Sequence, residues 1–124
     1  MSEKTILYIE DNEYNRKIVR QLLSRTSYRL IEAVDGESGV AQAQQELPDL
    51  ILMDVQLPKM SGLDAMRVLK ADPRTGHIPI IVITSFALSG DREKASAAGA
   101  NSYLAKPYSP RELLALVRQF LPEP

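Results

Sequence analysis

Residues 50–54, Leu50-Ile51-Leu52-Met53-Asp54, join four consecutive apolar side chains to one acid. A short, continuous apolar run is typical of a strand that is buried on both faces of a parallel sheet. An acid directly after such a strand lies at its carboxyl end, where open α/β sheets place their ligand sites. The stretch therefore predicts a central strand and a candidate site residue together.

Four more apolar runs flank this one along the chain. Those at 6–9 and 80–83 are also continuous, whereas those at 28–33 and 103–105 carry more polar residues and suit the edges of a sheet. Amphipathic helical stretches lie between the runs. Five β-α units predict an α/β fold, a (βα)5 doubly wound sandwich with a parallel five-stranded sheet. Five strands favour the flavodoxin-like order 2-1-3-4-5.

The helical stretch from about residue 88 to 98 differs from the others, because its apolar residues after Leu88 are all alanines. Burial stabilises by ~25 cal/mol per Å² of apolar area, so an alanine contributes far less than a leucine. One interpretation is a weakly anchored helix that moves. A solvated helix that packs closely through small residues accounts for the pattern equally well.

Composition narrows the class of protein. The 124 residues suit one domain over residues 1–124. With 15 basic and 16 acidic side chains the net charge is −1, which provides no field to attract nucleic acid or anionic lipid. The absence of cysteine excludes disulfides and thiolate chemistry. No apolar run approaches the ~20 residues of a membrane span, and the start lacks a secretory pattern, so we expect a cytoplasmic protein.

Polar residues follow four of the five predicted strands. Glu10 and Asp11 follow the first, Asp54 the third, Thr84 the fourth and Lys106 the fifth. In the predicted order these strand ends are neighbours, so three carboxylates, a hydroxyl and an ammonium converge on one edge. Two unit charges ~4 Å apart repel by about 4 kcal/mol at an effective dielectric constant of about 20. Three clustered acids therefore call for a cation.

The same residues also have structural interpretations. Asp11 or Asn12 could serve only as a helix N-cap, and singly such acids are more often structural. A purely structural role explains Asp54 less well, because it directly follows a strand that is predicted to be buried. An oxygen-only ligand set favours Mg²⁺, which binds one or two carboxylates with waters and phosphate oxygens. A carboxylate nucleophile, a divalent cation and the Lys106 ammonium together indicate phosphoryl transfer.

The motifs at these strand ends carry a resemblance to a known family. In order and spacing, the chain resembles a CheY-like response-regulator receiver domain of the stand-alone type, over essentially its full length. The segments that carry the resemblance are Tyr8-Ile9-Glu10-Asp11-Asn12, Asp54-Val55-Gln56-Leu57-Pro58-Lys59-Met60-Ser61-Gly62, Ile83-Thr84-Ser85 and Tyr103-Leu104-Ala105-Lys106-Pro107.

The resemblance implies a role for each residue that matches the motif at the first and third strands. Asp54 is the expected phospho-acceptor. Mg²⁺ would be bound by Asp11 and Asp54 directly, by the backbone carbonyl of Gln56, and by Glu10 through water. Gln56 and Phe86, each two residues beyond a motif residue, would tune the lifetime of the phosphoryl group, and a bulky Phe86 would shield it.

The fourth and fifth strands supply the expected switch. Lys106 would pair with the phosphoryl group, and Thr84 would donate a hydrogen bond to it. The rotamer of Tyr103 would follow Thr84 and alter the surface formed by the fourth helix, fifth strand and fifth helix. The Lys106–Pro107 peptide is expected to be cis.

As a whole, the resemblance implies Mg²⁺-dependent two-component phosphorelay signalling. The expected donor is a histidine kinase or a histidine phosphotransfer protein, and the signal would pass to a downstream protein rather than directly to nucleic acid or membrane. We expect a monomer or a phosphorylation-dependent dimer. Such a domain is a regulated acceptor and not an enzyme, because it catalyses only its own phosphorylation and dephosphorylation.

Three rival functions fit less well. A flavin or nucleotide module would need a phosphate-cradling loop after the first strand, where Glu10 and Asp11 would repel phosphate. A phosphohydrolase would need an Asp-x-Asp pair, but Val55 and Gln56 follow Asp54. A receiver-like domain that never accepts phosphate would not need the full set of chemical residues present here.

Overall fold

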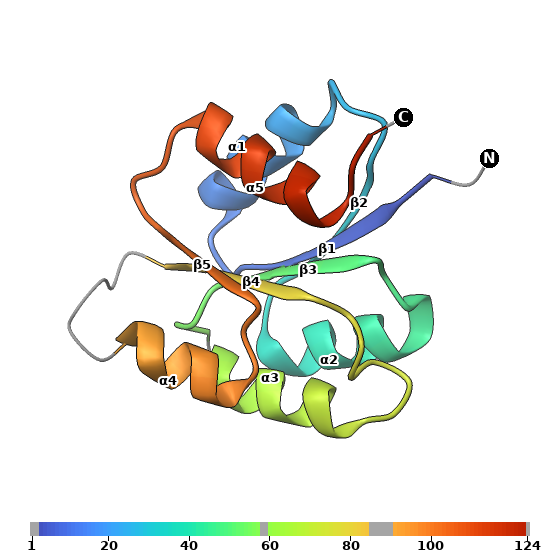
Figure 1. The fold of residues 1–124 in the computed structure, drawn as a ribbon, viewed down its shortest axis with the longest axis vertical. Coiled ribbons are helices and arrows are strands. Elements are labelled where there is room, and N and C mark those ends of the chain that lie inside the picture. The colour runs from blue at the N-terminus through green and yellow to red at the C-terminus, as the bar shows by residue number, and fades with distance from the viewer. Residues whose placement is uncertain (1–2, 58–59, 85–90, 124) are drawn as a thin grey trace.

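A five-stranded parallel sheet lies between two layers of helices in the computed structural model, which describes residues 3–57, 60–84 and 91–123 (Figure 1). The strand order is β2-β1-β3-β4-β5, which confirms the predicted fold class and order. Strands β2 and β5 lie at the edges, as their polar residues predicted. The strands are β1 (Thr5–Ile9), β2 (Arg29–Ala33), β3 (Leu50–Met53), β4 (Ile80–Thr84) and β5 (Ser102–Ala105).

Helices cover both faces of this sheet. In Figure 1, α1 and α5 cover one face while α2, α3 and α4 cover the other. Strand β3 is fully buried because its side chains alternate between two apolar clusters, one under each helical layer. The helices are α1 (Glu13–Leu23), α2 (Gly36–Glu46), α3 (Gly62–Ala71), α4 (Asp91–Ala98) and α5 (Pro110–Phe120).

Side-chain caps set where the helices begin. Asn12 caps α1 by accepting a hydrogen bond from the backbone N–H of Asn15 at 2.9 Å. Ser109 caps α5, with Pro110 in the first turn. Because the cap of α1 is Asn12 and not Asp11, the carboxylate of Asp11 remains available at the sheet edge.

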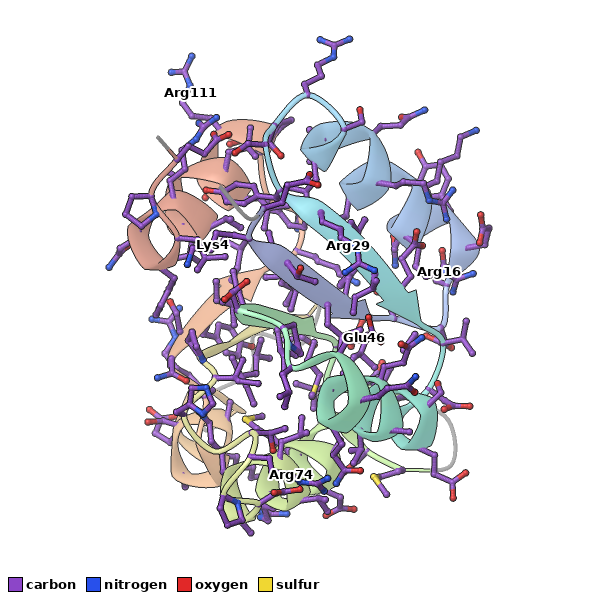
Figure 2. All side chains as sticks on the ribbon, turned by 90° about the vertical axis from the view of Figure 1, so that its right-hand side faces the viewer. Lys4, Arg16, Arg29, Glu46, Arg74 and Arg111 are labelled. Carbon is purple, nitrogen blue, oxygen red and sulfur yellow. The ribbon has the colours of Figure 1, made fainter. Side chains whose placement is uncertain are left out.

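The edge beside β2 carries ion pairs that link the sheet to its helices. Figure 2 looks onto this edge, where Arg29 of β2 lies near Glu46 of α2. Their charged atoms are 3.6 Å apart. Both side chains are partly exposed, so such a pair contributes little stability on its own.

Helix α4 is anchored by small side chains. Ala95 and Ala98 are its buried residues among those described, while Arg92, Glu93 and Lys94 are exposed. Alanine anchors bury little apolar area, which agrees with both interpretations of this segment. The expected helical residues before Asp91 lie outside the described part of the chain. No helix within that part is long and apolar enough to cross a membrane.

Candidate functional site

Three charged residues stand one position beyond the ends of their strands. Glu10 follows β1, Asp54 follows β3 and Lys106 follows β5. The backbone N–H of each still donates to a carbonyl of a neighbouring strand, at 3.0, 3.1 and 2.8 Å respectively. The sheet therefore fixes all three residues at one edge, as expected from the sequence.

The ammonium of Lys106 bridges the two acids. Its Nζ lies 3.0 Å from Oε1 of Glu10 and 3.0 Å from Oδ2 of Asp54. The backbone N–H of Gln56 donates to the other oxygen of Asp54, Oδ1, at 2.8 Å. Both oxygens of Asp54 thus accept a hydrogen bond, which orients the carboxylate. The residue is buried, with 7% of its surface exposed.

The carboxylate of Glu10 accepts further hydrogen bonds that the sequence motifs did not indicate. Oε2 accepts from the backbone N–H of Asn12 at 3.2 Å, and Oε1 accepts from the side chains of Asn15 and Tyr8, each at 3.3 Å. Arg16, labelled in Figure 2, donates to the Glu10 carbonyl at 2.8 Å. Tyr8 was predictable as a neighbour, because residues two apart on a strand share a face.

Burial and the neighbouring charges together shift the pKa values of the charged groups at this edge. Burial raises the pKa of Asp54, and the Glu10 charge adds to the effect against the Gln56 N–H and Lys106. Burial and the Glu10 carboxyl likewise raise the pKa of Asp11. For Glu10, burial is outweighed by Lys106 and the Asn12 N–H, so its pKa is lowered. The pKa of Lys106 is raised, since Glu10 and Asp54 outweigh its burial.

This donor set fits a hard divalent cation. Glu10, Asp11 and Asp54 bring three carboxylates near one ammonium, and burial first, then the Glu10 carboxyl, raise the pKa values of Asp11 and Asp54. No three acidic, histidine or cysteine side chains form a ready-made metal cage in the part of the chain that the structure describes. Mg²⁺ needs no such cage, because it keeps several waters and takes one or two carboxylates.

The expected switch residues lie on the neighbouring strands β4 and β5. Thr84 ends β4, is buried, and pairs in register with Ala105 of β5. Tyr103 lies on β5, half-buried, with the guanidinium of Arg92 5.0 Å from its ring centroid. The Lys106–Pro107 peptide is cis.

Of the two residues expected to tune the lifetime of the phosphoryl group, the structure describes Gln56 but not Phe86. Gln56, proposed to tune phosphoryl lifetime, has an exposed side chain beside the acids. Phe86, its expected partner in that role, lies outside the described residues, as does Ser85.

Gly62 is a further site residue, which the motif contained but to which no role was assigned. Its N–H donates to the carbonyl of Val55 at 2.8 Å, and a Cβ at this position would lie 2.7 Å from the Val55 Cα and against the Asp54 carbonyl. The first turn of α3 therefore packs directly on the backbone that carries Asp54. A side chain at position 62 would displace that backbone.

An open hollow of about 350 Å³ adjoins the site on the α1 side. Lys106 is one of the residues that line it, and the remaining lining is largely apolar, from Ile18, Pro107 and Tyr108 with Asn15. The hollow therefore gives a partner an apolar surface next to the bridging ammonium.

Comparison with known proteins places this geometry in context. The model of the response regulator receiver domain family matches residues 6–118. The polar-differentiation response regulator DivK of Brucella anthropi is 38% identical over 118 residues, which cover 95% of this chain and 96% of that protein.

Solved structures show the same similarity. The receiver domain of the sensor histidine kinase PA1611 from Pseudomonas aeruginosa, with a magnesium ion coordinated in its active-site cleft, superposes with a TM-score of 0.89 at 37% identity. That match covers 96% of this chain and 98% of the other. The chemotaxis response regulator CheY4 of Vibrio cholerae gives a TM-score of 0.90 at 27% identity, over 97% of this chain and all of CheY4.

Proposed function

The chain belongs to the response-regulator receiver family of two-component signalling, and on that premise we propose that Asp54 is its phospho-acceptor. The observation that carries the proposal is the bridge from Lys106 to Asp54, 3.0 Å between Nζ and Oδ2, in a site with excess negative charge. A buried carboxylate with both oxygens oriented is a positioned nucleophile. Receiver domains are regulatory rather than turnover enzymes.

The proposed reaction is a phosphoryl transfer between two side chains. A carboxylate oxygen of Asp54 attacks the phosphorus of a donor phosphohistidine, the P–N bond breaks, and the imidazole nitrogen leaves with the bonding pair and takes a proton. Lys106, already beside Oδ2, would follow the charge onto a phosphoryl oxygen. The Gln56 N–H keeps the carboxylate aimed during the approach.

Mg²⁺ is the proposed cofactor. Asp11, Asp54 and the Gln56 carbonyl would hold it, with Glu10 acting through a bound water. When bound, it would balance the excess negative charge and stabilise charge on the phosphoryl oxygens. The nearness of Glu10 supports this assignment, because its carboxyl adds to burial in raising the pKa values of Asp11 and Asp54, and a cation would offset that repulsion.

The proposed output is a change of surface rather than a released product. Phosphorylated Asp54 would draw the hydroxyl of Thr84 and shift the rotamer population of Tyr103, so that the α4–β5–α5 surface presents a different face to a downstream protein. Gln56 and Phe86 are proposed to set how long that state lasts, by controlling the access of water.

The donor is proposed to be a histidine kinase or a histidine phosphotransfer protein. The hollow beside Lys106 supports this, because its apolar lining of Ile18, Pro107 and Tyr108 would receive a partner's apolar surface. We propose a monomer or a phosphorylation-dependent dimer, in the cytoplasm, with no direct contact to nucleic acid or membrane. The net charge of −1 supports the last point.

Intact-mass measurement tests the acceptor. Incubation with acetyl phosphate and Mg²⁺ is expected to add ~80 Da, the mass of one phosphoryl group. Asp54→Asn keeps the shape of the side chain but should show no adduct, and chelation of Mg²⁺ should abolish the adduct on the unaltered chain. An adduct that persists in Asp54→Asn would assign the chemistry to another residue.

A further inference from the structure

The phenol of Tyr8 reaches from the core into the site. Its ring is fully buried in the apolar cluster between the sheet and α1 with α5. Within the described residues its hydroxyl has one hydrogen-bond partner, Oε1 of Glu10, at 3.3 Å. A buried phenol requires a partner, so this contact is built into the packing of the ring.

Oε1 of Glu10 is where the donors converge. It accepts from the Tyr8 hydroxyl, from the side-chain amide of Asn15 and from the ammonium of Lys106. Of these, Asn15 lies on the surface helix α1, and Lys106 is shared with Asp54 and is proposed to turn toward a phosphoryl oxygen. Tyr8 is therefore the donor whose position is fixed by the core.

The chain contains a second buried tyrosine that separates packing from positioning. Tyr28 belongs to the same apolar cluster and is 6% exposed, but its hydroxyl donates to the carbonyl of Leu121 near the amino end of β2, away from the acids. Both rings fill the same core. Only the hydroxyl of Tyr8 touches the site.

We propose that Tyr8 is a positioning residue that orders Glu10, and through it the acidic pair with Asp11, before Mg²⁺ binds. The inference rests on the proposed function. A group that orients a ligand from outside its coordination shell typically changes metal affinity without touching the metal. Without the phenol, Oε1 of Glu10 keeps only donors from Asn15 and Lys106 among the described residues, and neither is anchored in the apolar core.

The test compares Tyr8→Phe with Tyr28→Phe, each of which deletes one buried hydroxyl and keeps the ring. Titration with Mg²⁺ alone, followed by backbone amide NMR shifts, gives the Kd, and urea unfolding gives the stability. We expect Tyr8→Phe to weaken Mg²⁺ binding about threefold to tenfold, at or below the usual range for changes to groups that orient a metal ligand. Tyr28→Phe should leave the Kd within about twofold while it loses stability.

A kinetic measurement separates positioning from general damage. With acetyl phosphate, Tyr8→Phe should need several-fold more Mg²⁺ for half-maximal phosphorylation, yet reach nearly the same rate at saturating Mg²⁺. Asn15→Ala, which removes the neighbouring donor without altering the core, should shift the Mg²⁺ requirement in the same direction by less. This second variant keeps the inference testable if Tyr8→Phe folds poorly.

A double-mutant cycle tests the route through Glu10. In a Glu10→Ala background, Tyr8→Phe should no longer change the Mg²⁺ Kd. An unchanged or tighter Kd in Tyr8→Phe, or an effect that persists without Glu10, overturns the inference. If the unaltered chain binds Mg²⁺ and accepts phosphate in those experiments, the proposed function stands even so; if it does neither, the proposed function fails first and the inference with it.

Discussion

The guanidinium of Arg92, in the first turn of α4, lies 5.0 Å from the centroid of the Tyr103 ring on β5. This cation–π contact ties a helix that is otherwise anchored by alanines to the residue expected to report phosphorylation. It is worth about 0.5–1 kcal/mol at an exposed position. The contact therefore favours one rotamer of Tyr103 without locking it.

Arg92→Ala should release Tyr103. We expect a larger population of alternative ring rotamers and faster exchange between them, because the cation that covers the ring is gone. NMR relaxation dispersion and side-chain couplings of Tyr103 measure this, with Arg92→Lys as the control that keeps a cation. Equal rotamer populations in Arg92→Ala and the unaltered chain would show that the contact has no influence.

Mg²⁺ should stabilise the fold through the acids. At about one hundred times its Kd, a ligand that binds only the folded state adds about 2.7 kcal/mol to the free energy of unfolding.

Without metal, Asp54→Asn should raise the urea midpoint, because burial and Glu10 raise the pKa of Asp54 and its charge therefore disfavours folding at neutral pH. That penalty disappears as the pH falls through the raised pKa, so the two midpoints should converge in acid.

The outcome that contradicts this expectation is specific. If Mg²⁺ stabilises Asp54→Asn as much as the unaltered chain, Asp54 is not part of the metal site. Asp64→Asn, which removes an exposed carboxylate of α3 that pairs with Arg67 and not with the site residues, provides the control for charge alone.

Asp72, the C-cap of α3, should make part of the stability dependent on pH. Hydrogen bonds from Arg74, first from its side chain and then from its backbone N–H, lower the pKa of Asp72 to about 2. A lowered pKa means that this contribution is complete above the ordinary pKa of an unfolded aspartate and is lost as the pH falls toward 2. Asp72→Asn should reduce the difference between urea midpoints at neutral and strongly acid pH.

The strand ends explain how much of the site was predictable. Asp54 and Lys106 could be assigned because each directly follows an apolar run, and the parallel sheet order then brings them together. The direct contact between Lys106 and Glu10 was not predicted, since the reach of two long side chains depends on rotamers that no periodicity records. The expectation that Glu10 binds Mg²⁺ through water came from the family resemblance and stays a prediction.

Residues that act through packing were harder to recognise. In the sequence, Tyr8 looks like one more apolar residue of a buried strand. Its position two residues before Glu10 is the one indication that its hydroxyl lies near an acid. Arg16 contacts the Glu10 carbonyl across a helical turn, a distance that a long side chain covers from several positions. The start of α4 was placed near Leu88 from composition, and that part lies outside the described residues.

Gly62 provides the last prediction, because its lack of a side chain is what lets α3 approach the acceptor. In Gly62→Ala the new Cβ would lie 2.7 Å from the Val55 Cα, so the backbone must shift and carry Asp54 away from Lys106. Overpacking of this kind costs about 1–3 kcal/mol. Gly76→Ala is the control: its Cβ would lie 2.9 Å from the Lys70 carbonyl, a milder clash with backbone at the other end of α3. Both variants should lose stability in urea, but only Gly62→Ala should slow phosphorylation by acetyl phosphate. Equal slowing in the two variants would mean that the close approach at Gly62 serves the fold and not the acceptor.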